Sequence, residues 1–135
     1  MISTGVLHIT TARSWRGGEQ QVLYLAIALA EEGIRQCIVA PPGSELAKRA
    51  SQAGIPVMEI PILGEIDFLA VSRIRRIARE QGYGLLHAHT AKAHSLALLA
   101  RRKQPDLRLI VTRRVDFPAR PNFLSKKRYK RMQNF

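Results

Sequence analysis

The sequence has few of the features that are typical of secreted or membrane-spanning proteins. Cys37 is its one cysteine, so the chain can form no intrachain disulfide, and its place in the apolar segment 34–40 predicts a buried thiol rather than a nucleophile. The longest apolar run, Val22 to Ala30, is far shorter than the roughly 18 residues that a membrane-spanning helix needs. The N-terminus has no basic segment followed by an apolar stretch, which a secretory signal would show. These absences predict a cytoplasmic protein.

Acidic residues are also scarce, and the shortage is concentrated at one end of the chain. The 135 residues include 22 Lys or Arg and 10 Asp or Glu, which gives a net charge of +12. Residues 1–100 carry 10 basic and 8 acidic side chains, whereas residues 101–135 carry 12 basic and 2 acidic ones. With 46% hydrophobic residues, the chain has the composition of a single globular domain over 1–135. Its basic tail needs an anionic partner, solvent or a missing piece of protein around it.

Short β-like runs alternate with stretches of helical periodicity along the whole chain. This pattern predicts strands at 6–10, 36–40, 56–60, 84–88 and 107–112. It predicts helices at 18–33, 44–54, 67–81, 91–103 and 123–133, the second and third of them with Ser44 and Asp67 as N-caps. Such alternation is typical of right-handed βαβ units. We therefore expect an α/β fold with a Rossmann-like, doubly wound parallel sheet, strand order 3-2-1-4-5 and helices on both faces.

Two polar segments follow the first and fourth strands, which this strand order places side by side. Gly17-Gly18 lies between the first strand and a helix N-terminus, where exposed N–H groups and the positive end of the helix dipole favour an anion. Arg16 adds a cation to the same loop, and the histidine-rich segment 87–94 follows the fourth strand. Ligands of doubly wound folds bind beyond the carboxyl ends of the strands at this switch point. The sequence therefore predicts a phosphate-binding site here.

Several common site chemistries lack their motifs. A dinucleotide site needs GxGxxG directly after the first strand and an acidic residue at the end of the second, which here ends in Ala40-Pro41-Pro42. Neither a GxxxxGK motif followed by Ser or Thr nor a nucleophile elbow occurs. His87, His89 and His94 are possible zinc ligands, but no well-placed thiolate or carboxylate completes the set, and histidines that bond backbone groups are the favoured interpretation. We expect no metal and no cofactor.

Four short motifs in the expected order resemble the N-terminal, acceptor-side domain of family-4 glycosyltransferases, which have the GT-B fold. They are Gly17-Gly18-Glu19-Gln20-Gln21 leading into a helix, Pro41-Pro42-Gly43-Ser44-Glu45-Leu46, His87-Ala88-His89, and Thr112-Arg113-Arg114-Val115-Asp116-Phe117. The resemblance covers nearly the whole chain. It implies transfer of a hexosyl group from a nucleotide sugar to an acceptor hydroxyl, without an obligatory metal, in cell-envelope glycan or glycolipid synthesis.

The resemblance also implies roles for individual residues. Gly17, Gly18 and Arg16 would contact the donor diphosphate, and His89 and Arg114 would be the catalytic residues. The acceptor side of the cleft would contain Thr90, His94 and Arg113. Many family members have Thr-x-His after the fifth strand, where this chain has Arg114. An arginine cannot act as a general base at neutral pH, so Arg114 is expected to clamp a phosphate or an acidic acceptor group. The C-terminal, nucleotide-gripping domain of these enzymes does not follow within the 135 residues, and the chain is expected to be inactive alone.

The basic tail leaves other functions open. Aromatic residues are interleaved there with Lys126, Lys127, Arg128, Lys130 and Arg131, which suits peripheral contact with an anionic membrane surface from the cytoplasmic side. A sequence pI of about 11.1 would equally suit a nucleic-acid-binding protein, although the first hundred residues are nearly neutral and show no nucleic-acid-binding motif. A truncated and inactive fragment is the third interpretation.

Overall fold

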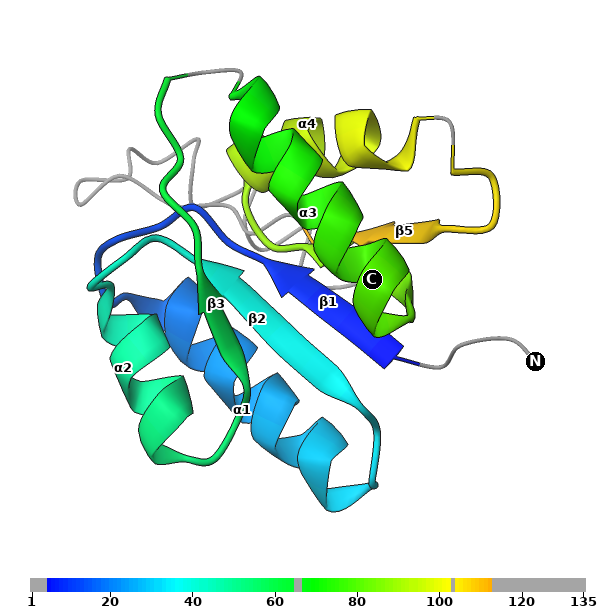
Figure 1. The fold of residues 1–135 in the computed structure, drawn as a ribbon. Helices are drawn as coiled ribbons and strands as arrows, with labels where there is room; N and C mark the ends of the chain where they lie inside the picture. Colours follow the sequence, from blue (N-terminus) through cyan, green and yellow to red (C-terminus); the bar gives the residue numbers. More distant parts are fainter. Residues whose placement is uncertain (1–4, 65–66, 103, 113–135) are drawn as a thin grey trace, which may run out of the picture.

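The computed structural model describes residues 5–64, 67–102 and 104–112, and strands and helices alternate throughout them (Figure 1). Their order is β1 (Gly5–Ile9), α1 (Gly17–Glu31), β2 (Gln36–Ala40), α2 (Glu45–Gln52), β3 (Val57–Glu59), α3 (Phe68–Gln81), β4 (Tyr83–Ala88), α4 (Ala91–Arg101) and β5 (Arg108–Val111). Each lies within a residue or two of its predicted range. The helix expected at 123–133 lies outside the described residues. No helix in the described ranges is long and apolar enough to cross a membrane.

The five strands form one parallel sheet in the order β3-β2-β1-β4-β5, as the sequence predicted. β1 is central, with β2 on one side and β4 on the other. In its register with β4, His8 lies beside His87 and Ile9 beside Ala88. The first three strands extend the sheet to one side of β1, and the chain then returns to place β4 on its other side. The carboxyl ends of β1 and β4 therefore lie next to each other at one edge of the sheet.

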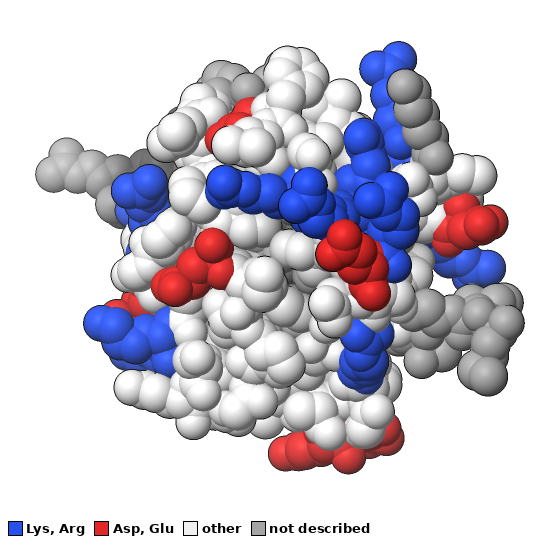
Figure 2. Space-filling model, viewed as in Figure 1, with Lys and Arg blue, Asp and Glu red and all other residues white. Residues whose placement is uncertain are grey.

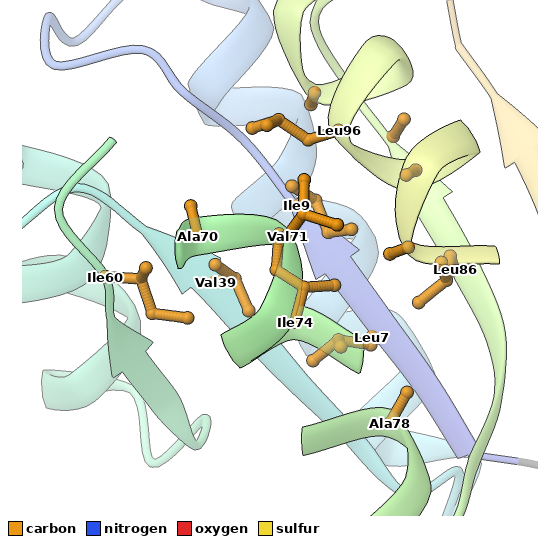
Figure 3. Packing of buried hydrophobic residues seen from close by; sticks show 14 of the residues in the cluster. Leu7, Ile9, Val39, Ile60, Ala70, Val71, Ile74, Ala78, Leu86 and Leu96 are labelled. Carbon is orange, nitrogen blue, oxygen red and sulfur yellow. The ribbon is translucent and has the colours of Figure 1, made fainter. Parts of the chain in front are cut away.

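Helices cover both faces of the sheet, and each face has its own apolar core. Leu7, Ile9 and Leu86 point to the face covered by α3 and α4, where Val71 and Ile74 pack on them (Figure 3). Ile38 and Ala40 belong to the opposite core, with residues of α1 and α2. Successive strand residues alternate between the two faces, and β2 contributes to both cores, with Cys37 and Val39 on one face and Ile38 and Ala40 on the other. The helices that follow β1 and β4 thus lie on opposite faces, as predicted.

Side chains next to the helix ends explain several boundaries. The Ser44 hydroxyl accepts a hydrogen bond from the Ala47 N–H group, and the Asp67 carboxylate accepts from Leu69 and Ala70, so both are the predicted N-caps. Backbone donors, first of all Leu63, also lower the pKa of Asp67 from its usual value. Gly82 ends α3 in the left-handed conformation, with φ of 73°, which glycine adopts without steric cost.

The arginines of α3 do not all face solvent. Arg73, Arg76 and Arg79 are exposed. Figure 2, viewed as in Figure 1, shows basic side chains across the middle of the molecular surface with acidic ones among them. Arg75 instead reaches α4, where its guanidinium donates to the carbonyl oxygens of Leu99 at 2.8 Å and Ala100 at 3.1 Å. These carbonyls lie in the last turn of α4, at the negative end of its dipole, so Arg75 caps the C-terminus of a neighbouring helix.

Candidate functional site

At the carboxyl ends of β1, β4 and β5, the backbone hydrogen bonds of the sheet continue into the residues that follow β4 and β5. The His89 N–H group donates to the Ile9 carbonyl and the Thr112 N–H group donates to the Ala88 carbonyl, both at 3.0 Å. His89 and Thr112 are therefore held in the plane of the sheet just beyond β4 and β5. This edge brings together the loop after β1 and the histidine segment after β4, which are far apart in the sequence.

A side-chain bond joins these two segments directly. The hydroxyl oxygens of Thr11 and Thr90 are 2.8 Å apart. Thr90 is also the N-cap of α4, because its hydroxyl accepts from the Ala93 N–H group at 3.1 Å. His94 lies one turn into α4, where its N–H group donates to the Thr90 carbonyl. The structure thus places Thr90 at the junction of the two loops, with His94 further along the helix.

The glycine pair opens α1 and leaves its first turn accessible. α1 begins at Gly17, directly after the extended Arg16, and the first N–H groups of a helix have no carbonyl partner within it. Gly17 is exposed, and a Cβ atom added there would meet no atom within 4 Å. The Glu19 carboxylate accepts from the Arg16 N–H group at 2.9 Å. Packing within the described residues therefore does not require glycine at position 17, and a side chain added there would enter open space.

Trp15 fixes the loop before the glycine pair. Its ring packs against the core formed by α1, α2 and β2, and the Arg49 guanidinium lies 4.3 Å from the ring centroid. A tryptophan in this loop could be a mobile lid or an anchor, and its partial burial under Arg49 makes it an anchor. The loop is thereby tied to α2.

Three histidines meet on one face of the sheet, and one of them was missed from the sequence. His8 on β1 lies beside His87 in the register, and His8 Nδ1 is 3.1 Å from His89 Nε2. The rings of His87 and His89 stack with centroids 3.9 Å apart, and His87 Nε2 is 2.6 Å from the Thr112 hydroxyl. His8 is fully buried and His89 is 4% exposed. A polar residue in the middle of the apolar run 6–10 was the signal that could have identified His8.

His8 has a second partner on β2 and stays neutral. Its Nε2 atom is 2.9 Å from Gln36 Oε1, and the Gln36 amide nitrogen donates to the carbonyl of Ala26 in α1. Burial lowers the pKa of His8 from 6.5 to about 4, against the Gln36 hydrogen bond, which raises it, while the nearby His87 lowers it further. At neutral pH the ring of His8 therefore carries one proton.

This arrangement changes the set of histidines that could hold a metal ion. The structure groups His87 and His89 with His8 rather than with His94, with one potential ligand nitrogen from each within 4.8 Å of the others. Three imidazoles are the ligands of some catalytic zinc sites. The expectation that the site uses no metal remains a prediction.

The remaining predicted site residues are not among those that the structure describes. Arg113, Arg114 and the basic residues Lys126, Lys127, Arg128, Lys130 and Arg131 are outside the described residues.

A hollow of about 990 Å³ is lined by Tyr83, Leu85, Arg108 and neighbouring residues. It lies at the amino ends of β4 and β5, the opposite end of the strands from the histidines, so it is not part of the candidate site.

Comparisons with known proteins agree with this fold. Among solved structures, a glycosyltransferase from Rickettsia africae matches 94% of this chain and 33% of its own, with a TM-score of 0.70 and 19% identity. MurG from Acinetobacter baumannii matches 92% of this chain and 39% of its own, with a TM-score of 0.68 and 14% identity. HepE from Anabaena, solved with UDP and glucose, matches 80% of this chain and 29% of its own, with a TM-score of 0.64 and 18% identity.

The chain therefore spans about a third of the length of these enzymes, and identities this low show a shared fold. A search of curated proteins found no match. The model of one protein family, described as a glycosyl transferase 4-like domain, matches residues 16–135. This match takes in the glycine pair, the histidine segment and everything that follows, and it shows that the chain belongs to the glycosyl transferase 4-like family.

Proposed function

We propose that this chain is the acceptor-side domain of a glycosyltransferase that moves a hexosyl group from a nucleotide sugar to an acceptor hydroxyl. The observation that carries the proposal is the meeting of the glycine loop and the histidine segment at one sheet edge, joined by the Thr11–Thr90 hydroxyl pair at 2.8 Å. Membership of the glycosyl transferase 4-like family supports the reaction class. The crystal structure of HepE with UDP and glucose supports a nucleotide sugar as the donor.

The start of α1 is the proposed contact for the donor diphosphate. The N–H groups of Gly17 and Gly18 and the side chain of Arg16 offer donors and positive charge at the helix N-terminus. Charge develops on the diphosphate as the bond to the sugar breaks. Fixed donors aimed at that charge stabilise the transition state more than the ground state, which is the basis of the catalysis proposed here.

The end of β4 is the proposed contact for the sugar and the acceptor. His89 is held beyond β4 by its backbone bond to Ile9, and Thr90 and His94 follow it at the start of α4. Arg113 and Arg114 come directly after Thr112 in the sequence. We assign His89 and Arg114 to catalysis, and Arg113 with Thr90 and His94 to the acceptor side.

A second, nucleotide-gripping domain is part of this proposal, because the chain spans only about a third of each related enzyme. The chain alone would then bind a nucleotide sugar weakly and would not turn it over. Transfer would take place in the synthesis of a cell-envelope glycan or glycolipid, with the protein at the inner face of the membrane.

Membrane contact is assigned to Lys126, Lys127, Arg128, Lys130 and Arg131. Each cation near an anionic lipid surface gains about 1 kcal/mol. Co-sedimentation with vesicles should therefore increase with anionic lipid content. Equal binding to neutral vesicles removes this part of the proposal, and tight salt-sensitive binding to single-stranded RNA would favour a nucleic-acid partner instead.

The donor assignment is tested by two substitutions at Gly17, where added atoms meet open space. Gly17→Asp places a negative charge at the first position of α1, which suits the helix dipole but repels a diphosphate. Gly17→Ala adds only a methyl group and is the control. We expect the chain to broaden the phosphorus NMR lines of UDP-glucose, Gly17→Ala to retain most of this effect and Gly17→Asp to lose it while remaining folded. Equal broadening by all three proteins, or none by the parent, contradicts the proposal.

A further inference from the structure

We propose that Gln36 and His8 are positioning residues that hold His89 in the tautomer with its proton on Nε2, so that Nδ1 carries the lone pair. The three side chains form a chain of hydrogen bonds from α1 through β2 and β1 to the end of β4. The bonds are Gln36 to Ala26, His8 Nε2 to Gln36 Oε1 at 2.9 Å, and His8 Nδ1 to His89 Nε2 at 3.1 Å. Each bond fixes the direction of the next.

The direction is set first at Gln36. A carbonyl oxygen can only accept, so the side-chain atom that contacts the Ala26 carbonyl has to be the amide nitrogen. The other side-chain atom is then the oxygen, and it faces His8. Gln36 is 4% exposed, so water has little access to satisfy the opposite orientation. An amide oxygen accepts only, and His8 therefore donates from Nε2.

His8 determines the donor and the acceptor of its hydrogen bond to His89, because its ring carries a single proton. Its ring is fully buried, and burial lowers its pKa to about 4, so it is neutral at physiological pH. In a neutral imidazole one nitrogen donates and the other accepts. With the proton on Nε2, Nδ1 of His8 is an acceptor, and the bond at 3.1 Å requires a proton on Nε2 of His89.

The consequence for His89 is that Nδ1, which is buried in this structure, is the ring nitrogen with the lone pair. A neutral His89 in this tautomer can accept a hydrogen bond through Nδ1 and cannot donate one from it. The stacked His87 ring, whose Nε2 is 2.6 Å from the Thr112 hydroxyl, packs against His89 and restricts its rotation.

A metal ion bound by the three histidines is the competing arrangement. It differs from the hydrogen-bonded arrangement by the proton on His89 Nε2. A metal bound between His8 and His89 needs a lone pair on His89 Nε2, because a ligating imidazole nitrogen cannot carry hydrogen. The proposed chain needs a proton on the same atom. The protonation of His89 Nε2 therefore decides between the two arrangements.

Nitrogen NMR of the histidine rings reads this protonation directly. In the complete chain near neutral pH, without added metal, Nε2 of both His8 and His89 should show the signal of a protonated ring nitrogen, and Nδ1 that of an unprotonated one. A coupling across the His8–His89 bond would support the assignment further. The opposite tautomer at His89, or stoichiometric Zn²⁺ binding that removes its Nε2 proton near neutral pH, overturns the proposal.

Gln36→Met tests this chain of hydrogen bonds. It removes the acceptor for His8 Nε2 without adding a charge and should leave both rings as mixtures of tautomers. Gln52→Met makes the same change on the exposed end of α2 and should leave all ring signals as they are. Unchanged His89 signals in a folded Gln36→Met protein contradict the proposal.

This test is independent of nucleotide-sugar binding because it uses no substrate. A protein with the expected tautomers that fails to bind UDP-glucose retains the chain of hydrogen bonds and loses the proposed function. A protein that binds UDP-glucose with the other tautomer at His89 retains the function and loses the chain of hydrogen bonds.

Discussion

The hydroxyl groups of Thr11 and Thr90, 2.8 Å apart, connect the loop that follows β1 to the helix that follows β4. Thr90 has two tasks, because its hydroxyl also accepts from the Ala93 N–H group and caps α4. The proposed site therefore depends on a residue that also stabilises the fold. Substitutions can separate the two contributions.

Thr90→Val should lower the free energy of unfolding by about 1 kcal/mol for the lost cap, with a further loss for the broken link to Thr11. Thr90→Ser retains a hydroxyl group for both bonds and should stay close to the parent. Thr11→Val breaks only the link and should have the smaller effect of the two valine variants. Urea denaturation measures all three. A Thr90→Val protein as stable as the parent would show that neither bond contributes.

His8 should make the stability of the chain depend on pH. Its pKa is about 4 in the folded protein and 6.5 when unperturbed, so between these values the unfolded state binds more protons. The free energy of unfolding should therefore fall as the pH falls from about 6.5 to about 4, by about 3 kcal/mol from this residue. The measurement is denaturation across this range for the parent and His8→Asn, which should lack this part of the slope. Equal slopes in both proteins would exclude His8 as the cause.

Arg75 should contribute to stability far more than its neighbour Arg73. Arg75→Met retains much of the apolar stem but loses both bonds to the end of α4, and we expect a loss of about 1–2 kcal/mol, since its charged hydrogen bonds are only partly buried. Arg73→Met removes an exposed arginine from the same helix and is the matched control. Thermal and urea unfolding compare the two. Similar effects would show that the loss of charge, rather than the cap, is responsible.

Much of the fold could be predicted from local patterns because each strand and helix has its own periodicity. Ser44 and Asp67 were identifiable as caps, since a capping side chain bonds N–H groups only two or three residues away. The switch point followed from strand order, and with it the proximity of the glycine loop to the segment after β4.

Contacts between elements were beyond local patterns. The position of His8 beside His87 depends on the register of two strands, which the sequence of either strand does not fix. A helical pattern shows which side of α3 is polar and would leave Arg75 in solvent, while the carbonyl groups of α4 that it contacts come from a separate segment. The partnership of Gln36 with His8 was missed for the same reason.

The two segments that form the candidate site are far apart in the sequence, and this separation affects how the protein folds. Thr11 and Thr90 are 79 residues apart, and His8 and His89 are 81 apart. Contacts this far apart form only after a long loop has closed, which slows folding through the entropy of closure. β1, α1 and β2 can assemble early because they are neighbours in the sequence, but the site exists only once β4 has paired with β1. Its formation would therefore report the late stages of folding.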